Sequence, residues 1–197
     1  MTILIIDHHD SFVYNLVNWF QKNSRIKTIV ESYNNFNLVK IQQPITKYSA
    51  VIFSPGPGHP HQYEKSKALY LSLNDKIPFL GVCLGYQIML TSHNAEIKQV
   101  AKSPLHGEQI QLRKKIKSRL LPDDVLKGYF VLYNSLGIPV HDKVFEDRFN
   151  LLAQKGQFSL AAEHKSLPHV GVQFHPESFA SSNGDYFLHS FLRLISC

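Results

Sequence analysis

Short apolar runs alternate with helix-like segments through the first half of the chain. The predicted strands are Thr2–Ile6, Lys27–Tyr33, Ala50–Phe53 and Ile77–Val82. The segments between them have helical character. Phe12, Leu16, Trp19 and Phe20 recur at helical spacing behind a cap at Asp10 or Ser11, and further helices are expected over Lys65–Leu73 and Tyr86–Ser92. This alternation predicts an α/β fold with a mostly parallel central sheet and flanking helices, in which ligands bind beyond the carboxyl ends of the strands.

The second half of the chain has a different pattern. Short strand candidates follow one another between turns: Glu108–Leu112, Tyr129–Leu132, Asn150–Ala153, Phe158–Ala162 and Val170–Phe174. They predict a smaller antiparallel section, closed by a helix over Gly184–Leu194. Because no linker or repeat divides the chain, we expect residues 1–197 to form a single domain.

Composition narrows the class of protein. The chain is 44% hydrophobic and 18% charged, as in ordinary globular proteins. No apolar run approaches the roughly 18–20 residues that span a bilayer, and Asp7 interrupts the apolar start too early for a signal peptide. With only two cysteines, a disulfide framework is not expected. We therefore expect a cytoplasmic protein that does not enter a membrane.

Part of the net charge of +6 is concentrated in a basic run, residues Arg113–Arg119. Such runs are usually solvated hairpins or loops, which is the interpretation favoured here. Nucleic-acid binding is the alternative, and it predicts affinity that falls steeply with salt. Few aromatic residues interleave with these bases, so no nucleic-acid partner is expected.

Cys83 lies between two glycines, Gly81 and Gly85, where a predicted strand meets a predicted helix. Glycines at this spacing allow the sharp turn of a nucleophile elbow. The amides and dipole at the helix N-terminus stabilise a thiolate, and the amide of Leu84 is placed to bind an oxyanion. The alternative is a buried, inert cysteine.

His175 and Glu177 follow another predicted strand and are separated by Pro176. Proline favours an extended conformation in the residue before it, and residues two apart in an extended segment point to the same side. A carboxylate beside an imidazole fixes its tautomer and stabilises its cation. Alone, the motif also fits a surface histidine before a turn. With the cysteine elbow, it predicts a Cys83–His175–Glu177 triad.

The segment Ser54–Pro60 is a proline- and glycine-rich loop after a buried strand. It lacks the spacing of nucleotide-binding glycine loops. A rigid loop with exposed backbone amides suits a second oxyanion donor, and a simple tight turn is the alternative.

Three motifs now stand in order: Ser54-Pro-Gly-Pro-Gly58, Gly81-Val-Cys-Leu-Gly-Tyr-Gln87 and Gly171-Val-Gln-Phe-His-Pro-Glu-Ser178. Together they resemble the class I (triad) glutamine amidotransferases. The opening Ile6–Leu16 is similar to the start of the small glutaminase subunits of anthranilate synthase and aminodeoxychorismate synthase. The resemblance extends from Thr2 to the last helix.

The resemblance implies a role for each matching residue. Cys83 is the nucleophile, His175 the general base and acid, and Glu177 the group that orients the histidine. The oxyanion hole consists of the amides of Gly56 and Leu84. The glutamine-binding residues are Gly56, Pro57, Gly58, Gln87, Ser135 and Leu136.

The resemblance also implies a partner. Members of this family deliver ammonia through a tunnel to a large chorismate-binding subunit, and Asp10–Asn15 and His106–Gly107 would lie near that interface. No cofactor is expected on the small subunit. The pairs His8-His9 and His59-x-His61 lack a cysteine or carboxylate cluster at ligand spacing, so no metal site is expected.

The chain departs from the family pattern at several positions. His8-His9 replaces Asn followed by an aromatic residue, Tyr86 replaces histidine, and Glu108 replaces lysine. Residues 132–136 read Leu-Tyr-Asn-Ser-Leu instead of Arg-Tyr-His-Ser-Leu. The triad and Gln87 are intact, so these changes concern partner contacts and not the glutaminase chemistry. The favoured interpretation is a glutaminase subunit of the tryptophan or folate branch. The alternatives are a γ-glutamyl hydrolase-type enzyme on the same scaffold and a non-catalytic regulatory subunit.

Overall fold

The protein is described by a computed structural model that covers residues 1–22, 26–43, 45–73, 77–100, 107–114 and 116–195. Its centre is an eight-stranded sheet in the order β2-β1-β3-β4-β12-β11-β10-β7. The first five of these strands are parallel: β2 (Lys27–Ser32), β1 (Thr2–Asp7), β3 (Ala50–Phe53), β4 (Phe79–Val82) and β12 (His169–Val172). The last three are antiparallel: β11 (Phe158–His164), β10 (Phe149–Lys155) and β7 (Arg113–Lys114). The predicted α/β class is confirmed.

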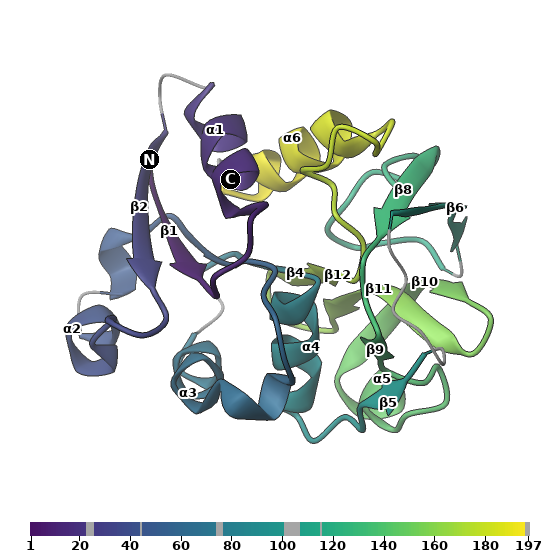
Figure 1. The fold of residues 1–197 in the computed structure, drawn as a ribbon, viewed down its shortest axis with the longest axis horizontal. Helices are drawn as coiled ribbons and strands as arrows, with labels where there is room; N and C mark the ends of the chain where they lie inside the picture. The colour runs from purple at the N-terminus through teal and green to yellow at the C-terminus, as the bar shows by residue number, and fades with distance from the viewer. Residues whose placement is uncertain (23–25, 44, 74–76, 101–106, 115, 196–197) are drawn as a thin grey trace.

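Helices cover both faces of the sheet (Figure 1). Helices α1 (Val13–Gln21) and α6 (Gly184–Ile195) pack on one face together with Ile3 and Ile5 of β1. Helices α3 (Glu64–Leu71) and α4 (Leu84–Thr91) pack on the other face with Leu4 and Ile6. The alternation along β1 therefore supplies two separate cores, as expected for a strand buried on both sides.

Shorter elements complete the fold. The remaining helical turns are α2 (Leu38–Gln42), η1 (Ile45–Lys47), η2 (Pro60–Gln62) and α5 (Val144–Asp147). Two small antiparallel sheets pair β5 (Lys98–Gln99) with β9 (Leu136–Gly137), and β6 (Glu108–Gln111) with β8 (Tyr129–Leu132). Among the described residues, no helix combines the length and the apolar character needed to cross a membrane.

The structure corrects the expected role of the last predicted strand. The sequence pattern places Val170–Phe174 in the antiparallel section, yet β12 pairs in parallel with β4 on one side and antiparallel with β11 on the other. The strand thus joins the two parts of the sheet. Because β4 and β12 are parallel neighbours, the segments that follow them, with Cys83 and His175, leave the sheet at the same edge.

The start of α1 also differs from the prediction. Phe12, not Asp10 or Ser11, is the N-cap residue, and no side chain caps the helix. Asp10 Oδ1 instead accepts a hydrogen bond from the Phe12 amide at 2.8 Å. Asp10 therefore orders the turn before the helix, and Phe12 is directed toward the ring of His175, with ring centroids 5.3 Å apart.

The basic run forms the edge strand β7 and a loop, apart from residue 115, which lies outside the described part of the chain. The Arg119 guanidinium donates hydrogen bonds to the carbonyls of His164 and Leu167. Buried Glu163 accepts hydrogen bonds from Ser118 Oγ and from the backbone amide of Arg119. This part of the run therefore anchors a loop to β11.

Candidate active site

Cys83 lies at the turn from β4 to α4 in a conformation rare for a residue with a side chain. Its φ of 52° and ψ of −102° fall outside the ordinary regions, as expected of a strained nucleophile elbow. The flanking glycines make the turn possible. A Cβ on Gly81 would lie 2.6 Å from the Gly85 oxygen, and one on Gly85 would lie 2.3 Å from the Phe53 oxygen. The packing therefore shows why glycine is needed on both sides of Cys83, as the sequence analysis predicted.

His175 and Glu177 are paired and buried. His175 Nδ1 and Glu177 Oε1 are 2.7 Å apart, and the two side chains are 2% and 0% exposed. The backbone holds the imidazole in place, because the His175 amide donates to the Val131 carbonyl and Ser181 Oγ donates to the His175 carbonyl. The structure therefore brings together the two side chains that sequence spacing paired.

The electrostatics favour a charged imidazole at His175. Burial by itself lowers the pKa, but the negative charge of Glu177 and the interaction with Cys83 outweigh burial and raise the pKa well above 6.5. Nδ1 is engaged by Glu177, while Nε2 has no hydrogen-bond partner among the described residues. Nε2 is thus the ring nitrogen that is not engaged by Glu177.

A cavity of about 140 Å³ opens beside Cys83. Its lining contains every residue predicted to bind glutamine or the oxyanion, together with Tyr133 and Asn134: Gly56, Pro57, Gly58, Leu84, Gln87, Ser135 and Leu136. Residues from three distant parts of the sequence therefore surround the sulfur of one cysteine.

Gly56 and Leu84, whose amides are the predicted oxyanion donors, pack against each other. Leu84 is the first residue of α4, so its amide has no acceptor within the helix. Gly56 packs so tightly that an added Cβ would lie 2.5 Å from Leu84 Cδ2 and 2.6 Å from His8 Cβ. Only glycine fits at position 56 without displacing this loop.

The loop around Gly56 is held by hydrogen bonds from several directions. Tyr63 donates its hydroxyl to the Pro57 carbonyl at 2.7 Å, and Gln62 Oε1 accepts from the His59 amide at 2.8 Å. Gly58 has a φ of 79°, a conformation that favours glycine. The result is a rigid loop that presents its backbone to the cavity.

His8 packs against the loop that contains Gly56. It is fully buried, its amide donates to Ser54 Oγ, and its Nε2 lies 2.9 Å from Ser66 Oγ. Burial lowers the pKa of His8 to about 3, so the ring is neutral at physiological pH. The histidine that replaces the family's asparagine is thus a packing residue here. Within the described residues, no cluster of metal-ligand side chains is present.

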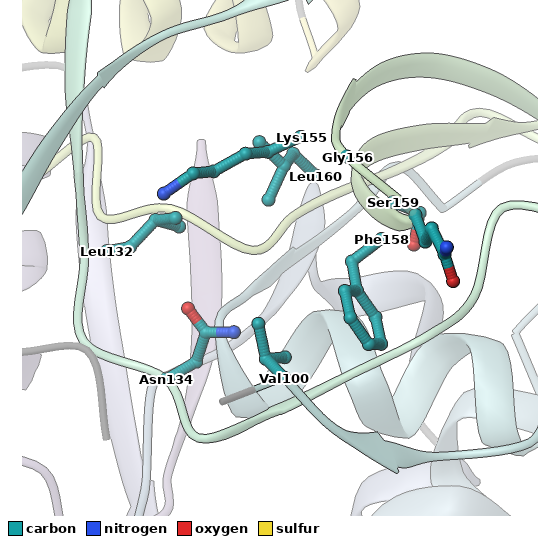
Figure 2. A pocket seen from close by; sticks show the side chains of 9 residues that line it. Val100, Leu132, Asn134, Lys155, Gly156, Phe158, Ser159 and Leu160 are labelled. Atoms are coloured by element: carbon teal, nitrogen blue, oxygen red, sulfur yellow. The ribbon is translucent and has the colours of Figure 1, made fainter. Parts of the chain in front are cut away.

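A second cavity, of about 430 Å³, also has Asn134 in its lining (Figure 2). Val100, Leu132 and Asn134 face the residues of the β10–β11 hairpin across it. Asn134 borders both cavities, and its Nδ2 donates to the Leu136 carbonyl at 2.9 Å. Its Oδ1 is buried and without a hydrogen-bond partner among the described residues.

Sequence reasoning missed one residue that touches the sulfur. Gln173 is fully buried, and its Nε2 lies 3.5 Å from Cys83 Sγ. The signal was present, since Gln173, His175 and Glu177 are spaced two apart in an extended segment. Of the predicted interface residues, His106 lies outside the described residues, whereas Gly107 is exposed.

Comparison with known proteins decides the family. Residues 4–195 match the family model "Glutamine amidotransferase class-I". This chain belongs to the class I glutamine amidotransferases. It is 35% identical over 201 residues to anthranilate synthase component 2 of Cyanidium caldarium, with 98% of each chain covered.

Two further similarities extend the comparison. A candidate aminodeoxychorismate synthase of Schizosaccharomyces pombe is 29% identical over 196 residues, and the amidotransferase spans 26% of that longer protein. A candidate GMP synthase subunit from Thermoplasma acidophilum has the same fold, with a TM-score of 0.81 and 16% identity, and the alignment covers 100% of this chain and 94% of that one.

Proposed function

We propose that this chain is a glutaminase subunit that hydrolyses L-glutamine to glutamate and ammonia and supplies the ammonia to a chorismate-using large subunit. The observation that carries the proposal is the arrangement of Cys83 and two candidate oxyanion amides around one small cavity, together with the buried His175–Glu177 pair, whose imidazole interacts with Cys83. Residues 1–197 act as one catalytic domain in this proposal, and the free nucleophile suits the reducing cytoplasm.

The reaction proceeds through a thioester. The Cys83 thiolate attacks the side-chain amide carbon of glutamine, and the Gly56 and Leu84 amides bind the resulting oxyanion. Protonated His175 transfers its Nε2 proton to the amide nitrogen, and ammonia leaves as the C–N bond breaks. Neutral His175 then takes a proton from water, and the resulting hydroxide attacks the thioester and regenerates Cys83 and glutamate. No cofactor enters these steps, in keeping with the family, whose members typically need none.

In this proposal, the other residues of the cavity bind glutamine. Gly58, Ser135 and Leu136 offer backbone groups, while Pro57 stiffens the loop. The Nε2 of Gln87 already donates to the Leu136 carbonyl and to Gln173 Oε1. Its side-chain oxygen is therefore the group that this residue offers to the substrate.

A surface next to the triad is suited to the large subunit. Phe179, two residues after Glu177, is 94% exposed, and Tyr14 on α1 is 68% exposed. A polar cavity of about 500 Å³ lies between α1 and the segment after His175, and both Glu177 and Phe179 line it. Aromatic side chains that are this exposed are typical anchors of protein interfaces. The relatives named as components of chorismate-using synthases support a partner of that kind.

The test is ammonia transfer. The purified chain and Cys83→Ala are each assayed with glutamine, alone and with each candidate large subunit plus chorismate. Glutamate and the aminated product, anthranilate or aminodeoxychorismate, are quantified by chromatography. We expect glutamine-dependent product with one or both large subunits, and its loss in Cys83→Ala.

Ammonium chloride in place of glutamine is the control, because it shows that each large subunit is active. Wild-type chain that releases no ammonia with any active partner would favour the regulatory-scaffold alternative. Hydrolysis of γ-glutamyl peptides in preference to glutamine would favour the hydrolase alternative.

A further inference from the structure

Gln173 connects the nucleophile to the wall of the glutamine cavity. It follows β12 directly, is completely buried, and donates its backbone amide to the Leu160 carbonyl at 2.8 Å. Its side chain reaches two groups of the site. Nε2 lies 3.5 Å from Cys83 Sγ, and Oε1 accepts a hydrogen bond from Gln87 Nε2 at 3.0 Å.

The hydrogen-bond network fixes the orientation of the Gln173 amide. Gln87 Nε2 also donates to the Leu136 carbonyl at 2.9 Å, and a carbonyl oxygen accepts only, so this end of Gln87 is its donor. The Gln173 atom facing it must therefore be the oxygen. The amino group of Gln173 is consequently the end directed at the sulfur, since the reverse orientation would place two donors face to face.

We propose that Gln173 is a further catalytic residue, which donates a hydrogen bond to the Cys83 thiolate and stabilises it before attack. This inference rests on the proposed glutaminase function. A hydrogen bond to an ionised acceptor is roughly twice as strong as one between neutral groups. Burial of the Gln173 side chain adds to the strength of this bond, because a hydrogen bond is electrostatically stronger in the protein interior than in water. Gln173 and His175 thus act on the same sulfur, the first as a fixed donor and the second as the proton carrier.

The experiment measures thiolate directly, as the pH dependence of Cys83 alkylation by iodoacetamide. Peptide mass spectrometry separates Cys83 from Cys197. Gln173→Met removes the donor with little change in length, and Gln173→Glu keeps an acceptor for Gln87 but presents a carboxylate to the sulfur. Gln111→Glu, on an exposed position of β6, is the charge-matched control.

We expect the alkylation midpoint to rise by about one pH unit in Gln173→Met, which is about a tenfold smaller ionisation constant of the thiol, and to rise further in Gln173→Glu. Gln111→Glu should match the wild type. A merely structural role for Gln173 would lower the melting temperature without moving the midpoint. Circular dichroism identifies the folded variants, and Gln173→Glu carries the test if Gln173→Met unfolds.

Unchanged midpoints in the folded variants would overturn the role of Gln173. That result is independent of the proposed function, because alkylation needs neither glutamine nor a large subunit. Conversely, a shifted midpoint in a chain that releases no ammonia with any partner would refute the glutaminase proposal and leave the hydrogen bond to sulfur established.

Discussion

Gly56→Ala is the substitution whose effect on this site is best defined by the packing. The added methyl would lie 2.5 Å from Leu84 Cδ2, 2.6 Å from His8 Cβ and 2.8 Å from the His8 carbonyl oxygen. Carbon atoms in contact are normally about 3.5–4.0 Å apart, so roughly 1 Å of separation must be created. His8 cannot provide it easily, because its ring is hydrogen-bonded to Ser66 and packed against Tyr63.

The loop that carries the Gly56 amide must therefore move away from Leu84. Overpacking of this kind costs about 1–3 kcal/mol of stability. Displacement or loss of one oxyanion donor typically lowers kcat by roughly a hundred- to a thousandfold. The assay is steady-state glutamate production in the presence of the large subunit, with the melting temperature measured in parallel. We expect kcat to fall by about a hundredfold or more, and the melting temperature to fall by a few degrees.

Gly156→Ala is the matched control. Gly156 has a φ of 54°, so alanine there strains the backbone by about 1–2 kcal/mol, yet its added methyl meets no atom within 4 Å. The control thus loses similar stability with no displacement near Cys83. An unchanged kcat in Gly56→Ala, or equal losses of kcat in both variants, would refute the assignment of Gly56 to the oxyanion hole.

Four further predictions concern charge, docking and stability. Glu177→Gln should lower kcat by about a hundredfold or more and move the basic limb of the kcat/KM profile to lower pH, because the carboxylate that raises the pKa of His175 is gone. Because its pKa is raised in the folded protein, wild-type His175 also contributes to the free energy of unfolding. This contribution is complete below about pH 6.5 and is lost as pH rises through the raised value, which pH-dependent urea denaturation measures. Phe179→Asp should weaken binding of the large subunit by about thirtyfold or more in isothermal titration and leave the melting temperature unchanged, since the side chain is 94% exposed; undiminished binding would place the interface elsewhere. Glu163→Ala should cost about 3 kcal/mol in urea denaturation with little change in kcat, because it leaves several part-buried donors around residues 118–120 without this acceptor; a loss below about 1 kcal/mol would contradict that role.

The parts of the site that sequence predicted are those determined by local geometry. The glycines around Cys83 signalled a turn because backbone atoms of Gly85 and Phe53 approach too closely for any side chain. The spacing of His175 and Glu177 predicted their pairing because extended backbone places alternate side chains together. These features depend on a few neighbouring residues, so a local sequence pattern is enough to predict them.

The features that sequence reasoning missed depend on tertiary contacts. The parallel pairing of β12 with β4 joins strands nearly 90 residues apart, and the apolar pattern of a buried strand does not distinguish a parallel from an antiparallel neighbour. Helices α2 and α5 contain five and four residues, too few to show periodicity. Phe12 matched the helical spacing of α1 but packs against the rings of Tyr133 and His175, a contact that outweighs its local preference.

Gln173 shows the same difference between features set by local geometry and features set by tertiary contacts. Its position two residues before His175 is compatible with a place on the same side of the segment, but the sequence analysis gave it no role, because its contacts depend on Gln87, which comes from helix α4. Only the assembled network shows which end of the amide faces the sulfur. Roles that arise from several elements thus become visible once their packing is known.

The most direct test of the central claim is capture of the covalent intermediate. The chain, in complex with its large subunit, is mixed with isotopically labelled glutamine, quenched in acid after milliseconds to seconds, digested and analysed by mass spectrometry. We predict a labelled glutamyl adduct on the peptide that contains Cys83, formed no more slowly than ammonia is released and absent from Cys83→Ala. Ammonia release that persists in Cys83→Ala, or that proceeds with no adduct at Cys83 at any time, would contradict the account.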